Sequence, residues 1–225
     1  MGRKAIIQGD FHASNKDAKK LLSRDTTATD AIFIEGRGDN IHLQRSAAYL
    51  LWLIGYLSLE IIYTTSNWIR ETLFNDHWEI RGAAISRGLA VEDEIDAELN
   101  EVWNLIHETA RRQFYYLALL LMLFTLIWPF FGDPVLGIPA GFIAVILAWL
   151  IPIGYSAGVI FRLSSDGVRD EIMSNSISEI SENEDYQEVL VLCGQEHVDG
   201  ISNRLEEEGW EVHSYDSVHP LSDLW

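Results

Sequence analysis

Apolar positions divide the chain into two polar end regions and a strongly apolar middle. In the end regions the apolar runs are short and are bounded by polar or turn residues, a pattern that is typical of strands. This pattern predicts strands over residues 5–8, 30–36, 188–193 and 210–215. Apolar residues at helical spacing predict helices over 14–22, 166–180 and 198–209, and Ser14 with Asp17 forms a capping box at the start of the first.

The order of these elements indicates the fold class. Strand, helix and strand follow one another over residues 5–36, which predicts a right-handed crossover and parallel pairing of the two strands. The same order recurs over residues 188–215. We therefore expect an α/β fold in which N- and C-terminal segments together build a small, mainly parallel sheet with flanking helices.

The apolar middle contains two long uncharged runs. Residues 113–132 and 134–161 carry no charged side chain over 20 and 28 positions. At about 1.5 Å per helical residue, the first run matches the roughly 30 Å hydrocarbon core of a bilayer and the second exceeds it. Because only a short link around Asp133 separates them, they predict an inserted two-helix transmembrane hairpin. A buried helix pair of a soluble protein is the alternative.

Basic residues predict the orientation of this hairpin. Arg111 and Arg112 precede it and Arg162 follows it, whereas the link carries only Asp133. By the positive-inside rule, the protein is expected in the cell membrane with two spans and with its soluble parts in the cytoplasm. The expected division is 1–112 as the N-terminal part of the α/β domain with a helical extension, 113–161 as the hairpin, and 162–225 as the C-terminal part of the same domain.

Further helices are expected next to the hairpin. Residues 46–69 are apolar, but only 14 uncharged positions precede Glu60, which favours a core or interfacial helix over a span. Residues 91–112 have the spacing of an amphipathic helix that continues into the first span, whereas 64–91 indicates no element. Two small-xxx-small pairs could join two hairpins in a homo-oligomer, namely Gly137 with Gly141 and Gly154 with Gly158.

Composition narrows the functional classes. The chain has 34 acidic and 16 basic residues and a formal net charge of −18, which argues against nucleic acid as a partner because phosphates require a basic surface. An acidic surface is also typical of proteins from salt-rich cytoplasm, so a halophilic archaeal host is expected. Cys193 is the only cysteine, which excludes an internal disulfide framework and a cysteine-based zinc cluster. The N-terminus lacks the pattern of a signal peptide.

Two predicted strands end in the same short motif. Gly9 is followed by His12, and Gly194 by His197, at identical spacing, and a third predicted strand carries Glu35 at its end. Ligands of parallel sheets gather at the carboxyl ends of the strands. Two imidazoles and a carboxylate meeting there have the chemistry of a divalent-metal site. The alternative is that these histidines are hydrogen-bonding loop residues.

A family resemblance supports the metal site. GDFHAS followed by DAIFIEGRGD resembles the opening of the TraB/PrgY (pheromone shutdown) group of the Tiki–TraB superfamily, and RDEIMSNSISEI followed by VLVLCGQEHVDGI is similar to its second half. The resemblance implies that His12, Glu35 and His197 are metal and active-site positions and that Arg37 and Arg169 are characteristic arginines. It covers residues 5–40 and 166–205, and the hairpin stands where the family has a helical middle.

The resemblance implies a metal-dependent hydrolase or peptidase that acts on peptides at the cytoplasmic face. His12 and His197 would hold a divalent ion (Mn, Co or Zn), and Glu35 would ligate it or take a proton from its water. Arg37 and Arg169 would hold a substrate carboxylate or a developing oxyanion. The alternative is a non-enzymatic membrane regulator that binds a peptide or signal in the same pocket.

Other candidate residues have structural interpretations beside the functional ones. Asp10 and Glu196, inside the two motifs, either join the site or face solvent. Surface or structural roles are expected for the rest, which are Ser14 as a helix cap, Glu60 at the membrane interface, Cys193 in a strand core, and His213 and His219 outside the metal site.

Overall fold

The structure is a computed structural model, and it describes residues 2–10, 15–24, 28–36, 44–74, 79–130, 139–165 and 167–218. The chain forms two compact units, which are treated separately below. The sheet unit comprises Met1–Asn40, His77–Leu99 and Ser164–Trp225, and the helical unit comprises Ile41–Asp76 and Asn100–Leu163. The helical unit thus includes 41–76 and 100–112, which the sequence pattern assigned to the N-terminal part of the α/β domain.

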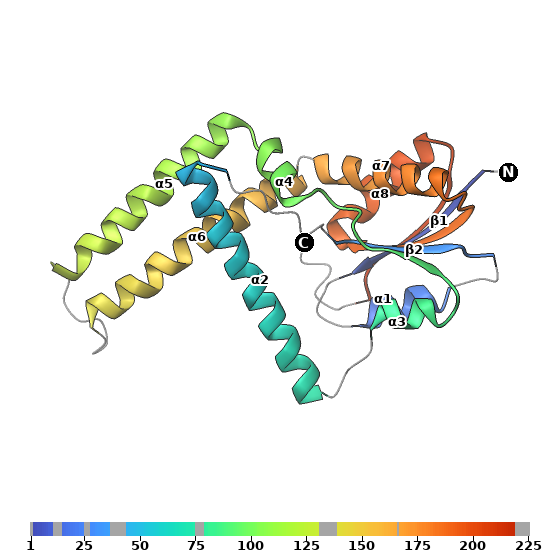
Figure 1. The fold of residues 1–225 in the computed structure, drawn as a ribbon, viewed down its shortest axis with the longest axis horizontal. Helices are drawn as coiled ribbons and strands as arrows, with labels where there is room; N and C mark the ends of the chain where they lie inside the picture. The colour runs from blue at the N-terminus through green and yellow to red at the C-terminus, as the bar shows by residue number, and fades with distance from the viewer. Residues whose placement is uncertain are drawn as a thin grey trace. The chain divides into compact units, whose positions relative to one another are not determined.

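The sheet unit contains five strands in one parallel sheet (Figure 1). The strands are β1 (Lys4–Asp10), β2 (Ala31–Ile34), β3 (Ala90–Glu92), β4 (Glu188–Gly194) and β5 (Glu211–Tyr215). Their order is β3-β2-β4-β1-β5. N- and C-terminal segments therefore build the sheet together, and the expected α/β class is confirmed.

The position of β4 corrects one expectation. We predicted that the first two strands would pair directly, but β4 lies between them and pairs in parallel with both. Short apolar runs specify strands without specifying their neighbours, because any two such runs can form the same backbone hydrogen bonds. The central position goes to β4, whose residues Val189–Gly194 are all buried. The strand that leads to His197 is thus flanked by those that lead to His12 and Glu35.

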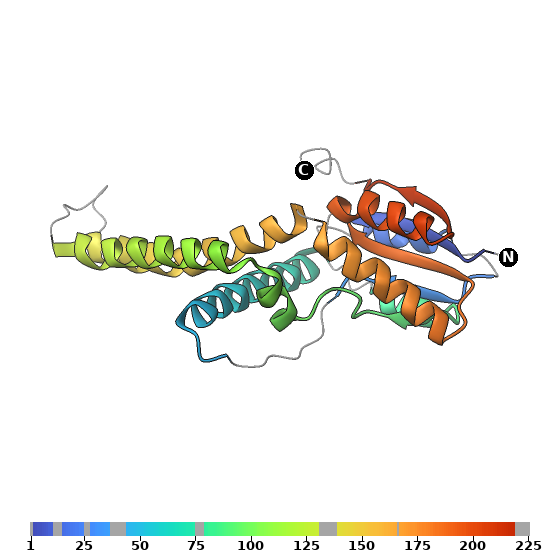
Figure 2. The ribbon, with the colours of Figure 1, turned by 90° about the horizontal axis from the view of Figure 1, so that it is seen from above.

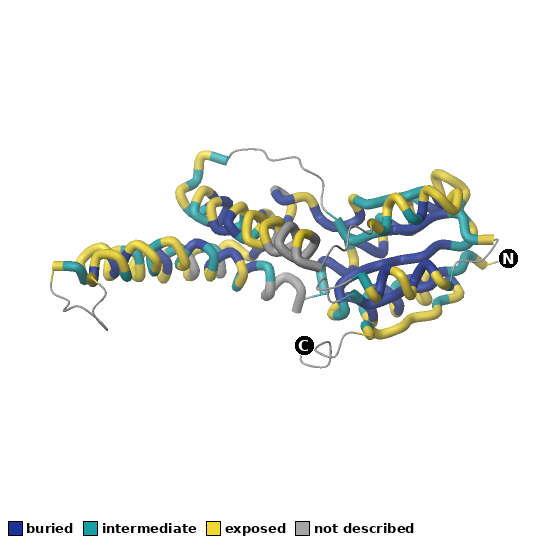
Figure 3. Tube along the Cα trace, turned by 90° about the horizontal axis from the view of Figure 1, so that it is seen from below, coloured by how far each residue is buried: buried dark blue, intermediate teal, exposed yellow. Residues whose placement is uncertain are grey.

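Helices cover both faces of this sheet (Figure 2). Alternate strand residues point to opposite faces, so Ile7 packs with α7 (Val168–Asn183) and α8 (Val198–Glu207), whereas Ile6 packs with α1 (Lys16–Leu22) and α3 (Ile80–Ile85). Figure 3 shows the strands as the buried layer between these helices. Buried side chains anchor the helices, among them Leu21 of α1 and Ile177 of α7.

Two parts of the sequence prediction differ from the structure. Residues 91–112 do not form one amphipathic helix: β3 ends at Glu92, irregular backbone follows, and α4 (Leu99–Leu105) is separated from α5 (Glu108–Ile127). The break arises because 93–98 packs against the end of β2, as described below. The region 64–91, which showed no clear pattern, contains α3 and the edge strand β3. These two elements are only six and three residues long, and each contains a charged residue.

The helical unit contains two helices that are long and apolar enough to span a membrane. These segments are Arg111–Phe130, which consists of α5 from Arg111 onward and the short helix η1 (Trp128–Phe130), and Ala140–Ile160 of α6 (Ala140–Ser165). Most of their large apolar side chains are exposed, as Figure 3 shows by the yellow along both. The third long helix is α2 (Ala47–Phe74), at the place where a core or interfacial helix was expected. The link around Asp133 lies outside the described residues.

Candidate functional site

Three strands end side by side in the centre of the sheet. The parallel register pairs Gly9 with Cys193 and Asp10 with Gly194. Glu35, the residue after β2, donates its backbone N–H to the Leu192 carbonyl at 2.9 Å. The carboxyl ends of β1, β4 and β2 therefore lie at one edge, where the side chains of the following residues can meet.

His197 occupies the centre of this edge. It ends the short helix η2 (Gln195–His197), precedes α8, and is fully buried. Its Nδ1 lies 2.6 Å from Oδ1 of Asp170 in the first turn of α7. Its Nε2 lies 3.7 Å from Oε1 of Glu196 and 4.0 Å from Oε1 of Glu35, and among the described residues it has no hydrogen-bond partner. Because Asp170 accepts the proton of Nδ1, we assign a lone pair to Nε2.

A close approach of two helices places Asp170 at the ring. A Cβ at position 200 of α8 would overlap the Asp170 carboxylate, so Gly200 gives α7 room at this point. Sequence reasoning missed Asp170, although it follows Arg169 in the motif quoted above. The available signals were an acidic residue in the first turn of a helix and a glycine three residues after His197.

Glu35 lies in an ion-pair network. Its Oε1 accepts a hydrogen bond from Nη2 of Arg169 at 2.6 Å, and its Oε2 accepts one from the Gly194 backbone N–H at 2.5 Å. Arg169 also binds Asp96, through Nη2 to Oδ2 at 2.7 Å and through Nε to Oδ1 at 3.1 Å. Burial lowers the pKa of Arg169, but the hydrogen bonds and charges of Asp96 and Glu35 outweigh it and raise the pKa above its ordinary value.

Asp96 is a second site residue that sequence reasoning missed. It lies in the irregular segment after β3, where a helix was predicted. Its backbone N–H donates to the Gly36 carbonyl at 3.0 Å, and its Oδ1 accepts from the Ala97 backbone N–H at 2.8 Å. A Cβ at Gly36 would overlap the carbonyl of Asp93, so this glycine lets the segment pack against the end of β2.

The two Gly-x-x-His motifs are in contact through Gln195. A Cβ at Gly9 would overlap Oε1 of Gln195, and the same Gln195 oxygen accepts the Ser217 backbone N–H at 2.6 Å. Its Nε2 donates to Oδ1 of Asp216 at 2.8 Å. Asp17 of α1 accepts two further hydrogen bonds from this segment, from the Ser217 hydroxyl at 2.6 Å and the Val218 N–H at 2.7 Å. The chain after β5 is thereby bonded to the second motif and to α1, the helix that follows the first motif.

The site is rich in negative charge. Burial raises the pKa of the Cys193 thiol well above its usual value, and the nearby charges of Glu35, Glu196 and Asp170 raise it further. Arg169 supplies a positive charge, but it is bound by two carboxylates. The chemistry of the site therefore favours a cation, and an imidazole lone pair beside carboxylates suits a divalent metal ion.

The other predicted site residues fall into three groups. Those outside the described residues are His12, Ser14, Arg37 and His219, and the positions of the two histidines and Arg37 stay predictions. The predicted Ser14 cap is corrected, because α1 begins at Lys16 and Asn15 occupies its N-cap position. His213 lies on β5 with its Nε2 at 3.2 Å from Oε1 of Glu211, on exposed side chains. Cys193 is buried in β4. No group of three His, Cys, Asp or Glu side chains within the described ranges is arranged to hold a metal ion.

Comparison with known proteins identifies no relative, so the function is interpreted from the geometry of the site. No protein-family model matches the chain, and no curated protein or solved structure matches it significantly.

Proposed function

We propose that this protein is a membrane-anchored, metal-dependent hydrolase of the TraB/PrgY type, acting on peptides at the cytoplasmic face of the cell membrane. The observation that carries the proposal is the environment of His197. A fully buried imidazole holds one nitrogen against Asp170, while the other has no hydrogen-bond partner among the described residues and lies beside Glu35. A buried polar atom without a partner is costly, and a ligand would remove that cost.

The residues at this edge fit a divalent ion. A metal-ligating histidine commonly donates its second ring N–H to a carboxylate, which fixes the tautomer, and Asp170 supplies that carboxylate to His197. In the proposal Nε2 of His197, Glu35 and His12 hold Mn, Co or Zn. Such an ion supplies a bound water whose pKa falls to about 7.

The chain's own residues would then orient the reaction. Asp170 fixes the His197 ring, and the Gly194 N–H holds Oε2 of Glu35. If Glu35 does not ligate the ion, its Oε1, which lies 4.0 Å from Nε2 of His197, is the atom that would take a proton from a nucleophilic water. Arg169 compensates the charge of Glu35 through its bond to the same oxygen. Arg37 is the residue proposed to bind the substrate carboxylate or oxyanion.

The two long apolar helices support the proposed membrane anchoring. Only 12% and 28% of their most apolar windows are buried, and basic residues stand only at the ends of the segment 111–162. We propose that they form a hairpin with the sheet unit in the cytoplasm.

One observation favours the alternative role of a non-enzymatic regulator. Arg169 directs two of its nitrogen atoms to Asp96 and Glu35 inside the protein, and its side chain is buried. An arginine held in this way organises a pocket without presenting these donors to a substrate. A regulator that binds a peptide or signal in the same pocket would use such an arrangement.

Metal content is the measurement that tests the proposal. We would purify the protein in mild detergent at high salt, supply Mn, Co or Zn, and count bound ions by elemental mass spectrometry beside His12→Ala and His197→Ala. His213→Ala is the matched control, because His213 is exposed on β5. We expect about one ion per chain in the wild type and the control, and its loss from both motif variants. If the folded wild-type protein bound no ion, the proposal of a hydrolase would fail and the non-enzymatic regulator would take its place.

A further inference from the structure

Helix α2 carries an exposed apolar stripe that the proposed function does not use. Leu50, Ile54, Leu57 and Ile61 recur at steps of four, three and four residues, which places them on one side of the helix. Their exposed fractions are 45%, 53%, 41% and 65%. The side that contacts the rest of the helical unit carries buried side chains, including Tyr49 and Trp52.

The connections of α2 exclude a single membrane crossing. The chain enters α2 after β2 and leaves it before β3, and these two strands pair in the same sheet. One crossing would put them on opposite sides of the membrane. The α2 helix is about 42 Å long, but the link from Phe74 to Ile80 reaches only about 20 Å, too short to return through a hydrocarbon core of roughly 30 Å.

Nevertheless, α2 is fixed to one of the two candidate spans. A Cβ at Gly55 would overlap the carbonyl group of Pro152 in α6, so the backbones of the two helices approach closely there. One turn later in α6, the buried Ser156 hydroxyl donates to the Trp52 carbonyl at 2.6 Å. Small residues and interhelical serine hydrogen bonds are characteristic of helix packing within membranes.

The crossing point also indicates depth. The carboxyl end of α6 leads directly to α7 of the sheet unit, so the sheet-side end of the candidate span is Ile160. Ser156 precedes Ile160 by about 6 Å along the helix and Pro152 precedes it by about 12 Å. A helix that binds at a membrane surface buries its apolar face about 5–10 Å into the boundary between headgroups and acyl chains. The crossing with α2 falls at that depth.

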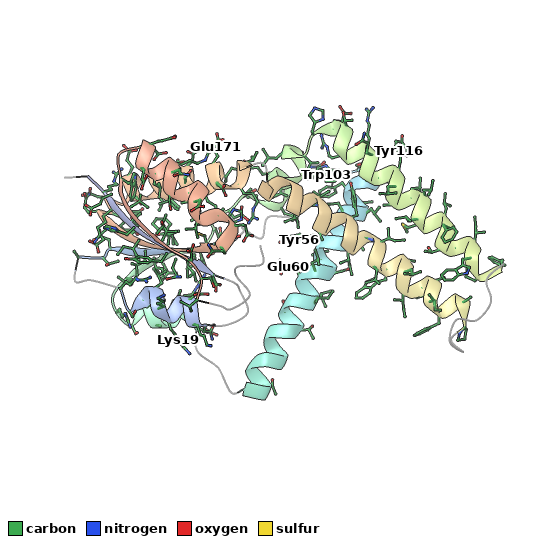
Figure 4. The ribbon with its side chains drawn as sticks, turned by 180° about the vertical axis from the view of Figure 1, so that it is seen from behind. Lys19, Tyr56, Glu60, Trp103, Tyr116 and Glu171 are labelled. Atoms are coloured by element: carbon green, nitrogen blue, oxygen red, sulfur yellow. The ribbon has the colours of Figure 1, made fainter. Side chains whose placement is uncertain are left out.

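We propose that α2 is an interfacial helix whose stripe, Leu50, Ile54, Leu57 and Ile61, binds the lipids of the leaflet nearest the sheet unit. The proposal rests on the membrane anchoring proposed above. In this proposal α2 lies at the membrane surface and neither spans the membrane nor binds a protein partner. The reason is that the chain on both sides of α2 leads to strands of the sheet unit, while the middle of α2 contacts α6. On another side of α2, the Tyr56 hydroxyl donates to Glu60 at 2.9 Å, and both residues lie next to each other in Figure 4. Tyr56 also stacks on the buried Trp52, with ring centroids 5.8 Å apart, so this pair lies next to the face that packs within the helical unit and away from the stripe.

Site-directed spin labelling measures this directly. Cys193 is fully buried, so cysteines introduced at exposed positions would be labelled selectively in the native protein. Labels at Ile54→Cys and Ile61→Cys would report on the stripe after reconstitution in lipid nanodiscs. Leu150→Cys, on an exposed position in the middle of the candidate span of α6, is the control for the bilayer core, and Glu206→Cys, exposed on α8, is the control for water. Collision rates with oxygen and with a water-soluble nickel chelate give the depth of each label.

We expect both stripe labels to show a ratio of oxygen to nickel collisions between those of Leu150→Cys and Glu206→Cys. Stripe labels as accessible to nickel as Glu206→Cys, beside a lipid-exposed Leu150→Cys, would overturn the interfacial helix and leave the anchor intact. Stripe labels as deep as Leu150→Cys would also overturn it, as would labels shielded from both reagents, which would indicate a second copy. If Leu150→Cys were itself in water, membrane anchoring would fail and the interfacial helix with it.

Discussion

Gln195, the second residue of one Gly-x-x-His motif, places its side-chain oxygen where a Cβ of Gly9, the first residue of the other motif, would lie. The motifs come from opposite ends of the chain and are joined by the β1–β4 pair, which sets Asp10 opposite Gly194. Gln195 also binds the segment that follows β5. The glycine is therefore needed for contact between the motifs.

Replacing Gly9 by alanine should destabilise the sheet unit. The added Cβ would meet Oε1 of Gln195 and lie 3.1 Å from Cγ2 of Val198. The Gln195 side chain cannot turn away without losing its hydrogen bonds to Asp216 and Ser217. Inserting a carbon into packed surroundings costs about 1–3 kcal/mol, and denaturant unfolding in detergent would measure it.

Gly82→Ala is the matched control for this substitution. Gly82 lies in α3, and a Cβ there would meet nothing within 4 Å among the described residues. Alanine favours the helix over glycine by about 0.8–1.0 kcal/mol, so this variant should equal or exceed the wild type in stability. Equal stability of Gly9→Ala and Gly82→Ala would contradict the contact between Gly9 and Gln195.

Asp170→Asn should weaken metal binding without removing a ligand. The substitution keeps the shape of the side chain but removes the charge that holds Nδ1 of His197. Loss of such a partner commonly lowers metal affinity by about 10–100-fold. Competition with a metal-binding dye would measure the affinity, and Asp199→Asn, an exposed carboxylate on α8, is the control that should leave it unchanged. An unaltered affinity in Asp170→Asn would remove His197 from the set of proposed ligands.

The sequence predicts much of the sheet but only part of the site. Short apolar runs predict β1, β2 and β4 because these strands are buried on both faces of the sheet, and β5 was also predicted although most of its residues are exposed. The edge strand β3 is three residues long and only half-buried, so it leaves almost no apolar signal. Their positions at the ends of predicted strands placed Glu35 and His197 in the candidate site, and His197 also belongs to a Gly-x-x-His motif. Asp96 and Asp170 were not found, because their roles depend on contacts with Arg169 and His197 that no local pattern encodes.

Tyr186 offers a test of the packing at the edge of the sheet. Burial, together with the hydrogen bond to Oε1 of Glu92 at 3.0 Å, raises the pKa of its phenol to about 12. Because the folded pKa lies above the unfolded value of about 10, the stabilisation is complete below pH 10 and is lost as the pH rises through 12. The absorbance difference between wild type and Tyr186→Phe should titrate near pH 12 when folded and near 10 in urea. A midpoint near 10 in the folded protein would contradict the burial of this hydroxyl.

Removal of the Arg169 guanidinium should be the most damaging change at the site. Arg169→Met would leave Asp96, which is buried, and Glu35 without their shared cation. Breaking a buried ion pair by removing one partner costs about 3–5 kcal/mol, because the remaining charges stay desolvated.

Arg204→Met is the matched control. Arg204 binds Glu171 at 3.5 Å between more exposed side chains of α8 and α7, where an ion pair contributes about 0–1 kcal/mol. Unfolding in denaturant should therefore shift strongly for the first variant and slightly for the second. A small shift in Arg169→Met, with an unchanged m-value, would mean that Asp96 and Glu35 do not depend on this cation, and the network would lose its proposed part in holding Glu35 beside His197.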